Sequence, residues 1–255
     1  MLALFGAGAS AAGVGLLARG SGAFASTTPP TGVPESEIPE ETAGPYPGDG
    51  SNGPDVLEQS GIVRSDITTS FGEATGVADG VPTTLEFFVY DLANGGAPFE
   101  GVAVYAWHCT RDGGYSMYSE GFENENYLRG VQIADADGKV TFTSIFPGCY
   151  AGRWPHVHFE VYPDEASITD SANAIATSQL AFPEDVCSVV YAEAGYEASV
   201  SNVTNVSLDS DGIFADDGAG TQLATVTGDV AGGYHASLSV GVDTSTSPGG
   251  GGVGR

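Results

Sequence analysis

Short stretches in which large apolar residues alternate with other residues recur along this chain, with turn residues between them. In the clearest stretch, residues 83–90, Leu85, Phe87 and Val89 occupy every second position. Strand side chains point alternately to two faces, so this pattern is typical of a strand with one face in a core. Further strands are expected at 102–109, 140–145, 156–162, 177–182, 196–208, 223–227 and 234–242, a hairpin turn at 135–138 and a short helix at 184–194. No long helical pattern competes with these strands. The sequence therefore predicts an all-β protein with a β-sandwich core, an extended N-terminal arm and irregular loops.

The two ends of the chain differ in composition from its middle. Residues 1–25 are small and apolar and end in Ala-Phe-Ala, which resembles an export signal with its cleavage site. Arg19 interrupts this run, which argues against the alternative of a membrane anchor. Residues 26–78 predict the extended arm, residues 79–242 the β-sandwich domain, and residues 243–255 a disordered Gly/Ser-rich tail. We expect the mature protein to be exported, as a secreted or cell-envelope protein.

The charge of the chain excludes some partners. Its 33 acidic residues against 7 basic ones give a net charge of −26. Such a surface repels phosphate backbones and anionic lipids, so we expect neither nucleic acid nor, in the mature form, a membrane as a partner.

The chain contains three cysteines, Cys109, Cys149 and Cys187. Export permits one disulfide and one remaining thiol, but the sequence leaves the pairing open.

The residues with the most evident chemistry lie between positions 149 and 160. His156 and His158 point to the same face of their predicted strand, while the residues between and after them form an apolar stripe. Two neutral imidazoles on one strand face provide half of a metal site, although a pair of solvated surface histidines has the same pattern. Tyr150 and Arg153 precede them on a loop rich in proline and glycine.

Three blocks of sequence, read together, resemble the intradiol ring-cleavage dioxygenases, the family of catechol and protocatechuate dioxygenases. The blocks are Trp107–Tyr115, Ile145–Tyr150 with the following Arg-x-x-His-x-His, and Ser178–Leu180. The resemblance extends from about residue 79 to residue 182, and the arm before it is similar to that of the extracellular branch. It implies a β-sandwich that holds a non-haem Fe(III) between two tyrosines and two histidines.

The resemblance also implies individual roles. Tyr150, His156 and His158 match three of the metal ligands, and Tyr115 matches the first tyrosine ligand, with Tyr118 as its competitor. Tyr150 would leave the metal and act as a base. The two remaining functional positions match Arg153, which would stabilise charge that builds on the ring, and Gln179, which would orient the intermediate. The loop between Tyr150 and Arg153 is shorter than in members that cleave aromatic acids, which affects the substrate pocket.

The chemistry of these side chains supports the assignment. Phenolate oxygens and imidazoles suit Fe(III), whose charge displaces the tyrosine protons. Glu160 lies on the same strand face as the histidines, so a carboxylate site for Fe(II) is an alternative. We expect His108 to be structural. The function that follows is O₂-dependent cleavage of a catechol between its hydroxylated carbons to a muconate-type diacid, most simply for a neutral catechol. The alternative is a non-catalytic metal-binding β-sandwich module, and the oligomeric state stays open.

Overall fold

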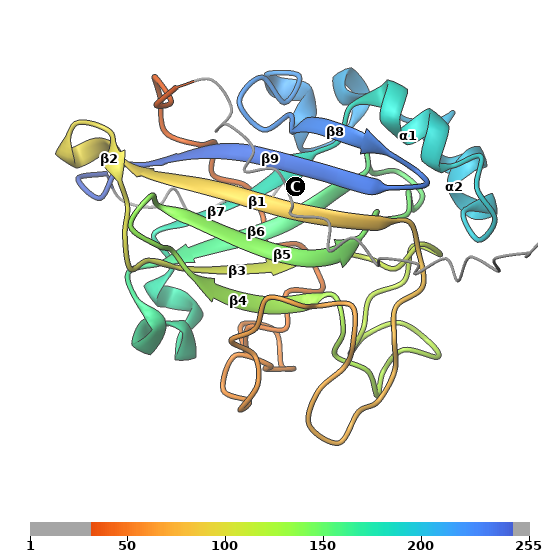
Figure 1. Ribbon diagram of the computed structural model, residues 1–255, viewed down its shortest axis with the longest axis horizontal. Helices are drawn as coiled ribbons and strands as arrows, with labels where there is room; N and C mark the ends of the chain where they lie inside the picture. The colour runs from red at the N-terminus through yellow and green to blue at the C-terminus, as the bar shows by residue number, and fades with distance from the viewer. Residues whose placement is uncertain (1–31, 247–255) are drawn as a thin grey trace, which may run out of the picture.

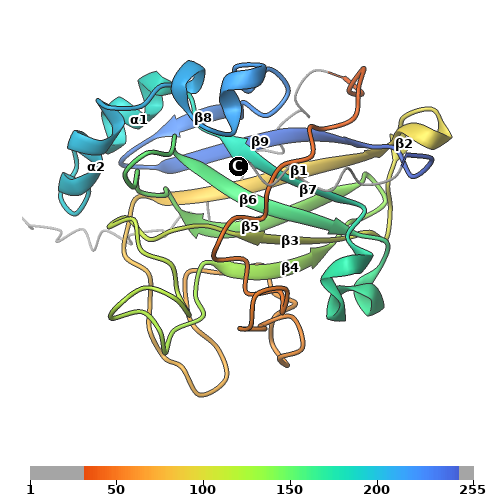
Figure 2. The same ribbon diagram turned by 180° about the vertical axis from the view of Figure 1, so that it is seen from behind.

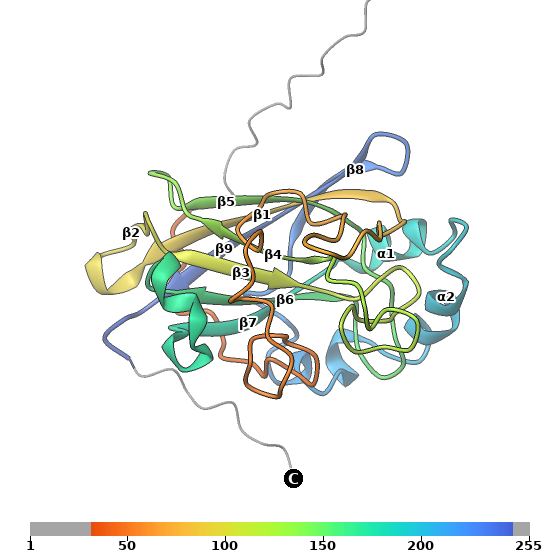
Figure 3. The ribbon, with the colours of Figure 1, turned by 90° about the horizontal axis from the view of Figure 1, so that it is seen from below.

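The computed structural model describes residues 32–246, so the predicted export signal and most of the predicted tail lie outside the described residues. Two β-sheets lie face to face as two layers (Figure 1, Figure 3). The five-stranded sheet contains β1 (Pro82–Asp91), β2 (Ala97–Pro98), β5 (Lys139–Ile145), β8 (Thr225–Asp229) and β9 (Gly233–Val242). The four-stranded sheet contains β3 (Ala103–Trp107), β4 (Arg129–Ile133), β6 (His156–Tyr162) and β7 (Ala176–Ala181). This arrangement is that of a β-sandwich.

Helices are short and lie outside the two layers. The α-helices are α1 (Glu184–Val190) and α2 (Glu197–Val203), at one end of the sandwich (Figure 1). The 3₁₀ turns are η1 (Leu92–Asn94), η2 (Glu165–Thr169), η3 (Ser171–Asn173), η4 (Leu208–Ser210) and η5 (Phe214–Asp216). Among the described residues, no helix is long and apolar enough to cross a membrane.

Strand order is β2-β1-β9-β8 in the first sheet, with β5 also paired to β1, and β4-β3-β6-β7 in the second. The pairing of β1 with β9 is parallel, and the other strand pairs are antiparallel. The main core lies between the layers, where Phe87 of β1 packs against Phe159 of β6 with ring centroids 4.9 Å apart. Burying each such ring contributes about 1.5–3 kcal/mol to folding.

A second apolar cluster covers the outer face of the four-stranded sheet. There Tyr105, Trp107 and Tyr162 are buried beneath Val56 and Leu57, which come from the chain before β1. Residues 32–81 contain isolated bridges but no assigned helix or strand of their own. We call residues 38–50 the covering segment; Figure 2 shows this orange part of the chain crossing β7, β6 and β3.

Three sequence-based predictions are wrong in the structure. Residues 196–208 were predicted as a strand, but residues 197–203 form helix α2, in which Ser199 alone is buried and the two-residue alternation of a strand is absent. The turn at 135–138 is present, with Gly138 N–H donating to the Asp135 carbonyl, but it carries the chain from one sheet to the other and forms no hairpin.

The third correction concerns the cysteines. Cys109, Cys149 and Cys187 are all buried and unpaired, so the described residues contain no disulfide. Burial raises the pKa of Cys109 and of Cys149 to about 12, so both remain thiols at neutral pH. The Cys109 thiol donates to the Gly148 carbonyl at 3.4 Å, which gives it a packing role beside the loop of Tyr150.

Candidate metal centre

One row of residues crosses the four-stranded sheet on its outer face. Strand register pairs Arg129 of β4 with Trp107 of β3, Trp107 with His158 of β6, and His158 with Gln179 of β7. Directly paired residues point to the same face of a sheet. The Trp107 ring stacks on His158, with centroids 5.0 Å apart and an interplanar angle of 6°. The row therefore places a buried arginine and a buried histidine on opposite sides of one indole.

The two histidines of β6 bring their Nε2 atoms together. His156 Nε2 lies 3.1 Å from His158 Nε2. His156 Nδ1 faces the carbonyl of Trp154, which can only accept, so the proton sits on Nδ1 and Nε2 carries a lone pair. Burial lowers the pKa of His156 to about 3, and the charge of Arg153 adds to this; burial and then His156 hold the pKa of His158 well below its usual value. Both imidazoles are therefore neutral at pH 7.

Two tyrosines complete the group. The Tyr150 hydroxyl lies 3.2 Å from His156 Nε2. The Tyr115 ring lies 5.8 Å from that of Tyr150 and 6.3 Å from that of His158. Within residues 32–246 its buried hydroxyl makes no hydrogen bond of good geometry, and the Tyr150 phenol is the group that lies beside it. Burial raises the pKa of Tyr150 to about 12 and that of Tyr115 well above 10. Both phenols therefore carry their protons at neutral pH in the metal-free protein.

Tyr118, the competitor for the first tyrosine position, is occupied elsewhere. Its hydroxyl accepts the N–H of Gly48 at 2.9 Å and donates to the Asn52 side chain at 2.8 Å. It thus binds the part of the chain that covers the sheet. The unpartnered hydroxyl of Tyr115 is the better candidate for a metal ligand, because a buried polar group without a partner is costly unless something else binds it.

Arg153 lies at the side of this group and has two partners. Its Nε donates to both oxygens of Asp211, at 2.9 and 3.2 Å, and its Nη2 donates to Gln179 Oε1 at 2.5 Å. The Arg153 Nη1 atom lies 3.5 Å from His156 Nε2. Gln179 in turn donates to the carbonyl of Thr42 in the covering segment. The structure thus brings Arg153 and Gln179, like Tyr150, the third predicted catalytic side chain, to the histidines.

Sequence reasoning missed Asp211. This carboxylate is fully buried and also accepts the N–H groups of Trp154, Ile213 and Phe214. Burial alone would raise its pKa, but Arg153 and these N–H groups outweigh burial and hold the pKa below its usual value. Asp211 is therefore ionised at neutral pH and fixes the orientation of Arg153. In the sequence it is one of several aspartates in an acidic loop between residues 209 and 220, and nothing local distinguishes it from the others.

The covering segment closes over the group. The Tyr46 ring lies 4.9 Å from the Tyr115 ring. Gly44 lies against His158: a Cβ at this glycine would stand 3.2 Å from His158 Cε1, and its φ of +73° also favours glycine. Arg129, which sequence reasoning also missed, donates to the carbonyls of Tyr46 and Pro47.

Two further predicted residues have other partners. His108 points into the sandwich, where its Nε2 lies 2.7 Å from the Ser144 hydroxyl, so its role is structural as expected. Glu160 accepts the hydroxyl of Tyr162 at 2.7 Å, and burial raises its pKa to about 8. Its carboxyl group is thus engaged by Tyr162, while the tyrosines lie against the histidines, which disfavours the carboxylate alternative.

The donor set fits a trivalent iron. Within residues 32–246, no cluster of three or more His, Cys, Asp or Glu side chains could hold a metal, so a metal here depends on the tyrosines. Two imidazoles and two phenols converge, and one phenol has no other partner. Hard oxygen donors with imidazole nitrogens are the set that suits Fe(III).

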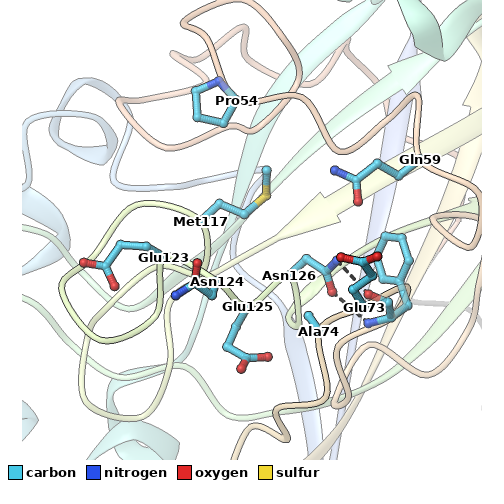
Figure 4. A pocket seen from close by; sticks show the side chains of 10 residues that line it. Pro54, Gln59, Glu73, Ala74, Met117, Glu123, Asn124, Glu125 and Asn126 are labelled. Atoms are coloured by element: carbon cyan, nitrogen blue, oxygen red, sulfur yellow. Dashed lines mark hydrogen bonds between the residues drawn. The ribbon is translucent and has the colours of Figure 1, made fainter.

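A separate cavity of about 510 Å³ lies beside Met117 (Figure 4). Three glutamates line it, including Glu125, which accepts the hydroxyl of Ser70 and the N–H of Gly76. Asn126 holds Phe71 there through two hydrogen bonds. None of the predicted site residues lines this cavity, so it is distinct from the tyrosine–histidine group.

Comparisons with known protein sequences find dioxygenases. Residues 52–161 match the family model described as dioxygenase. A chlorocatechol 1,2-dioxygenase from Rhodococcus opacus is 38% identical over 55 residues, which are 22% of this chain and 21% of that protein. The alignment thus covers about a fifth of the length of this curated relative.

Solved structures share the fold. An intradiol ring-cleavage dioxygenase from Tetranychus urticae superposes with a TM-score of 0.64 and 23% identity, over 83% of this chain and 97% of that one. The dioxygenase domain of a carbohydrate-binding fusion protein from Streptomyces sp. SirexAA-E gives a TM-score of 0.51 and 24% identity, over 82% and 99%. The strand arrangement of this chain is therefore one that known dioxygenases adopt.

Proposed function

We propose that this chain, whose residues 52–161 match the family model described as dioxygenase, is an intradiol ring-cleaving enzyme. It would bind a non-haem Fe(III) and cleave catechol-type diols between their two hydroxylated carbons with O₂, giving muconate-type diacids. The observation that supports this most is the meeting of four donors, Tyr115, Tyr150, His156 and His158, under the covering segment.

These four side chains would hold the metal. Bound Fe(III) would ionise the tyrosines and bind the catechol in an electron-rich form that reacts with O₂. Tyr150 lies nearer to solvent than the fully buried Tyr115, and its hydroxyl already shares a hydrogen bond with His156. We propose that Tyr150 accepts the proton of the incoming catechol, because a phenolate of high proton affinity is a suitable base.

Arg153 and Gln179 would act on the substrate side. Asp211 holds the Nε edge of the guanidinium and leaves Nη1 directed at the histidines. A fixed cation there stabilises negative charge as it develops on the ring and costs no reorganisation during the reaction. Gln179 holds the Nη2 edge of the same guanidinium.

We infer that the substrate is a neutral catechol. Arg153 is the cation directed at the histidines, and Arg129, the other arginine beside this group, gives its donors to uncharged oxygens. Within residues 32–246 no second cation therefore remains at this group to attract a carboxylated ring. Export of the mature protein stays a prediction, since its signal lies outside residues 32–246. The alternative, a non-catalytic metal-binding module, has no use for two phenol ligands.

The test is the colour and oxygen uptake of the iron-loaded protein. Tyrosinate bound to Fe(III) absorbs visible light, so we expect a coloured protein that consumes oxygen with catechol. In Tyr150→Phe the absorption should change and the uptake should fall by about 10²-fold or more. Tyr118→Phe is the matched control and should keep the colour. Colourless iron-loaded wild type would overturn the proposal, and loss of colour in Tyr118→Phe alone would reassign the ligand.

A further inference from the structure

Arg129 is a fully buried cation whose partners carry no charge. Its side chain donates to the carbonyls of Tyr46, Pro47 and Ser116 and to the hydroxyls of Ser116 and Tyr105, at distances of 2.7 to 3.0 Å. Within residues 32–246 no carboxylate forms an ion pair with it. Burying a charge is costly unless every donor is satisfied, and the fork of a guanidinium meets that need with several acceptors at fixed angles.

These partners belong to two segments that are distant in the chain. Tyr46 and Pro47 lie in the covering segment, and Ser116 lies in the loop that carries Tyr115. Neither segment is a strand of the sheet, so neither is held by a strand ladder. The hydroxyl of Tyr105 strengthens the first connection, because it donates to Pro47 and accepts from Arg129. Arg129 therefore fastens both segments to the outer face of the sheet.

The backbone on both sides of this contact is strained. Leu128, directly before Arg129, has a φ of 57°, and Met117, directly after Ser116, has a φ of 70°. In the part of the chain that the structure describes, only one other non-glycine residue, Ala219, has a positive φ. Such backbone persists only where surrounding contacts over-determine it, and it concentrates at functional sites. Two of the three strained residues thus flank one arginine.

Both fastened segments form walls of the candidate metal centre. The loop presents Tyr115, whose buried hydroxyl has no partner, and the covering segment packs Tyr46 on that ring and Gly44 on His158. A shift of either wall would move Tyr115 relative to the histidines. Arg129 itself is separated from His158 by Trp107, whereas Gln179, on the side proposed for the substrate, lies directly beside His158.

We propose that Arg129 is a positioning residue that locks the covering segment and the Tyr115 loop together, so that both walls of the metal centre form, or open, as one unit. The coupling of the two segments stands on the contacts alone. Its consequence for the metal rests on the proposed function.

The first experiment measures amide hydrogen exchange of the metal-free protein by mass spectrometry, in peptides from residues 42–50 and 113–120. In Arg129→Lys, which keeps the charge and loses the fork, both peptides should exchange at least about tenfold faster than in wild type, with β6 unchanged. Tyr105→Phe removes one donor to Pro47 and one acceptor of Arg129, so residues 42–50 and 113–120 should both exchange faster than in wild type, by less than in Arg129→Lys. The control, Arg111→Lys, changes a half-exposed arginine paired with Asp79 and should alter neither peptide.

Faster exchange in only one peptide of Arg129→Lys, or in neither, would overturn the coupling. Tyr105→Phe keeps the test valid if the arginine variant fails to fold, since faster exchange in only one of the two peptides, or in neither, would equally contradict the proposal.

The second experiment loads Fe(III) and records the visible band. Arg129→Lys should shift or weaken this band and lower kcat more than it raises KM, because Tyr115 is misplaced while the substrate side is intact. If the visible band is unchanged while both peptides exchange faster, Arg129 does not position Tyr115 for the metal. The coupling of the two segments would still hold. If wild type itself takes no colour, the proposed function fails, but the exchange result still decides whether Arg129 couples the two segments.

Discussion

Two arginines lie beside the candidate metal centre, and they are held in opposite ways. Arg129 is completely buried and gives all its hydrogen bonds to uncharged oxygens, four of them in chain segments outside the sheet. Arg153 keeps 18% of its side chain exposed and is paired with the buried carboxylate of Asp211. One lies behind the Trp107 ring and the other lies 3.5 Å from His156.

The difference separates a framework role from a chemical one. A guanidinium whose donors are all engaged by backbone and hydroxyl groups has nothing left to offer a substrate, but it holds several segments in place at once. A guanidinium that Asp211 and Gln179 hold through Nε and Nη2 is oriented and still directs Nη1 at the histidines. Removal of the first should therefore cost stability, and removal of the second should cost rate.

The largest expected effect tests this separation directly. Arg153→Lys should lower kcat by about 10²-fold, the cost of losing one preorganised charge donor, with a change in unfolding free energy below about 1 kcal/mol. Arg129→Lys should lower the unfolding free energy by about 2–4 kcal/mol, because it leaves buried acceptors unpaired. Oxygen uptake and urea denaturation of the metal-free protein measure the two quantities. Equal losses of stability in both variants would remove the distinction.

The second prediction sharpens what the carboxylate does for Arg153. Asp211→Asn should lower kcat by about tenfold, since the guanidinium loses its charged anchor, and the unfolding free energy by about 2 kcal/mol. Because the pKa of Asp211 is lowered in the folded protein, its stabilisation is present above the ordinary value of 3.8 and is lost as the pH falls through the folded value. Stability measured between pH 5 and pH 2 should therefore fall less steeply in the variant. An identical slope would show that Asp211 does not stabilise the fold through its charge.

The smallest expected effect concerns a carboxyl group that, unlike Asp211, forms no ion pair within residues 32–246. Glu40, in the covering segment, accepts the N–H of Thr177, and its pKa is raised to about 7, chiefly by burial and also by Glu37. A raised pKa means that the folded state loses stability as pH rises from 4.5 through 7. Glu40→Gln should raise Tm by a few degrees at pH 8 and leave it unchanged at pH 4. A variant whose Tm rises at pH 4 and not at pH 8 would contradict this prediction.

Local pattern predicted only the histidine pair of this centre, because two-residue alternation places the imidazoles of His156 and His158 on one face. The resemblance to intradiol dioxygenases, and no local pattern, indicated Tyr115, Tyr150, Arg153 and Gln179. Arg129 and Asp211 were missed because their partners lie far away: 83 residues separate Arg129 from Tyr46, and 58 separate Arg153 from Asp211. No local pattern reports such contacts.

The same limit explains the errors in the fold. Strand β4 was not predicted, because it begins with Arg129 and Gly130, which are unusual in a strand; this arginine is buried only through distant acceptors. Helix α2 was taken for a strand because serine and valine dominate it, although Ser199 is buried and its hydroxyl accepts the N–H of Cys149. In both places tertiary contacts outweighed local propensity.

The parallel pairing of β1 with β9 sets the order of assembly. Its register runs from Thr83 opposite Tyr234 to Asp91 opposite Val242, so the first long strand of the sandwich pairs with the last. During synthesis β1 must wait, with one edge bare, until every other strand has left the ribosome. The row that bears Trp107 and His158 belongs to the other sheet, whose strands are all made earlier. The five-stranded sheet is therefore completed last, when β9 pairs with β1 behind the sheet that carries the candidate metal centre.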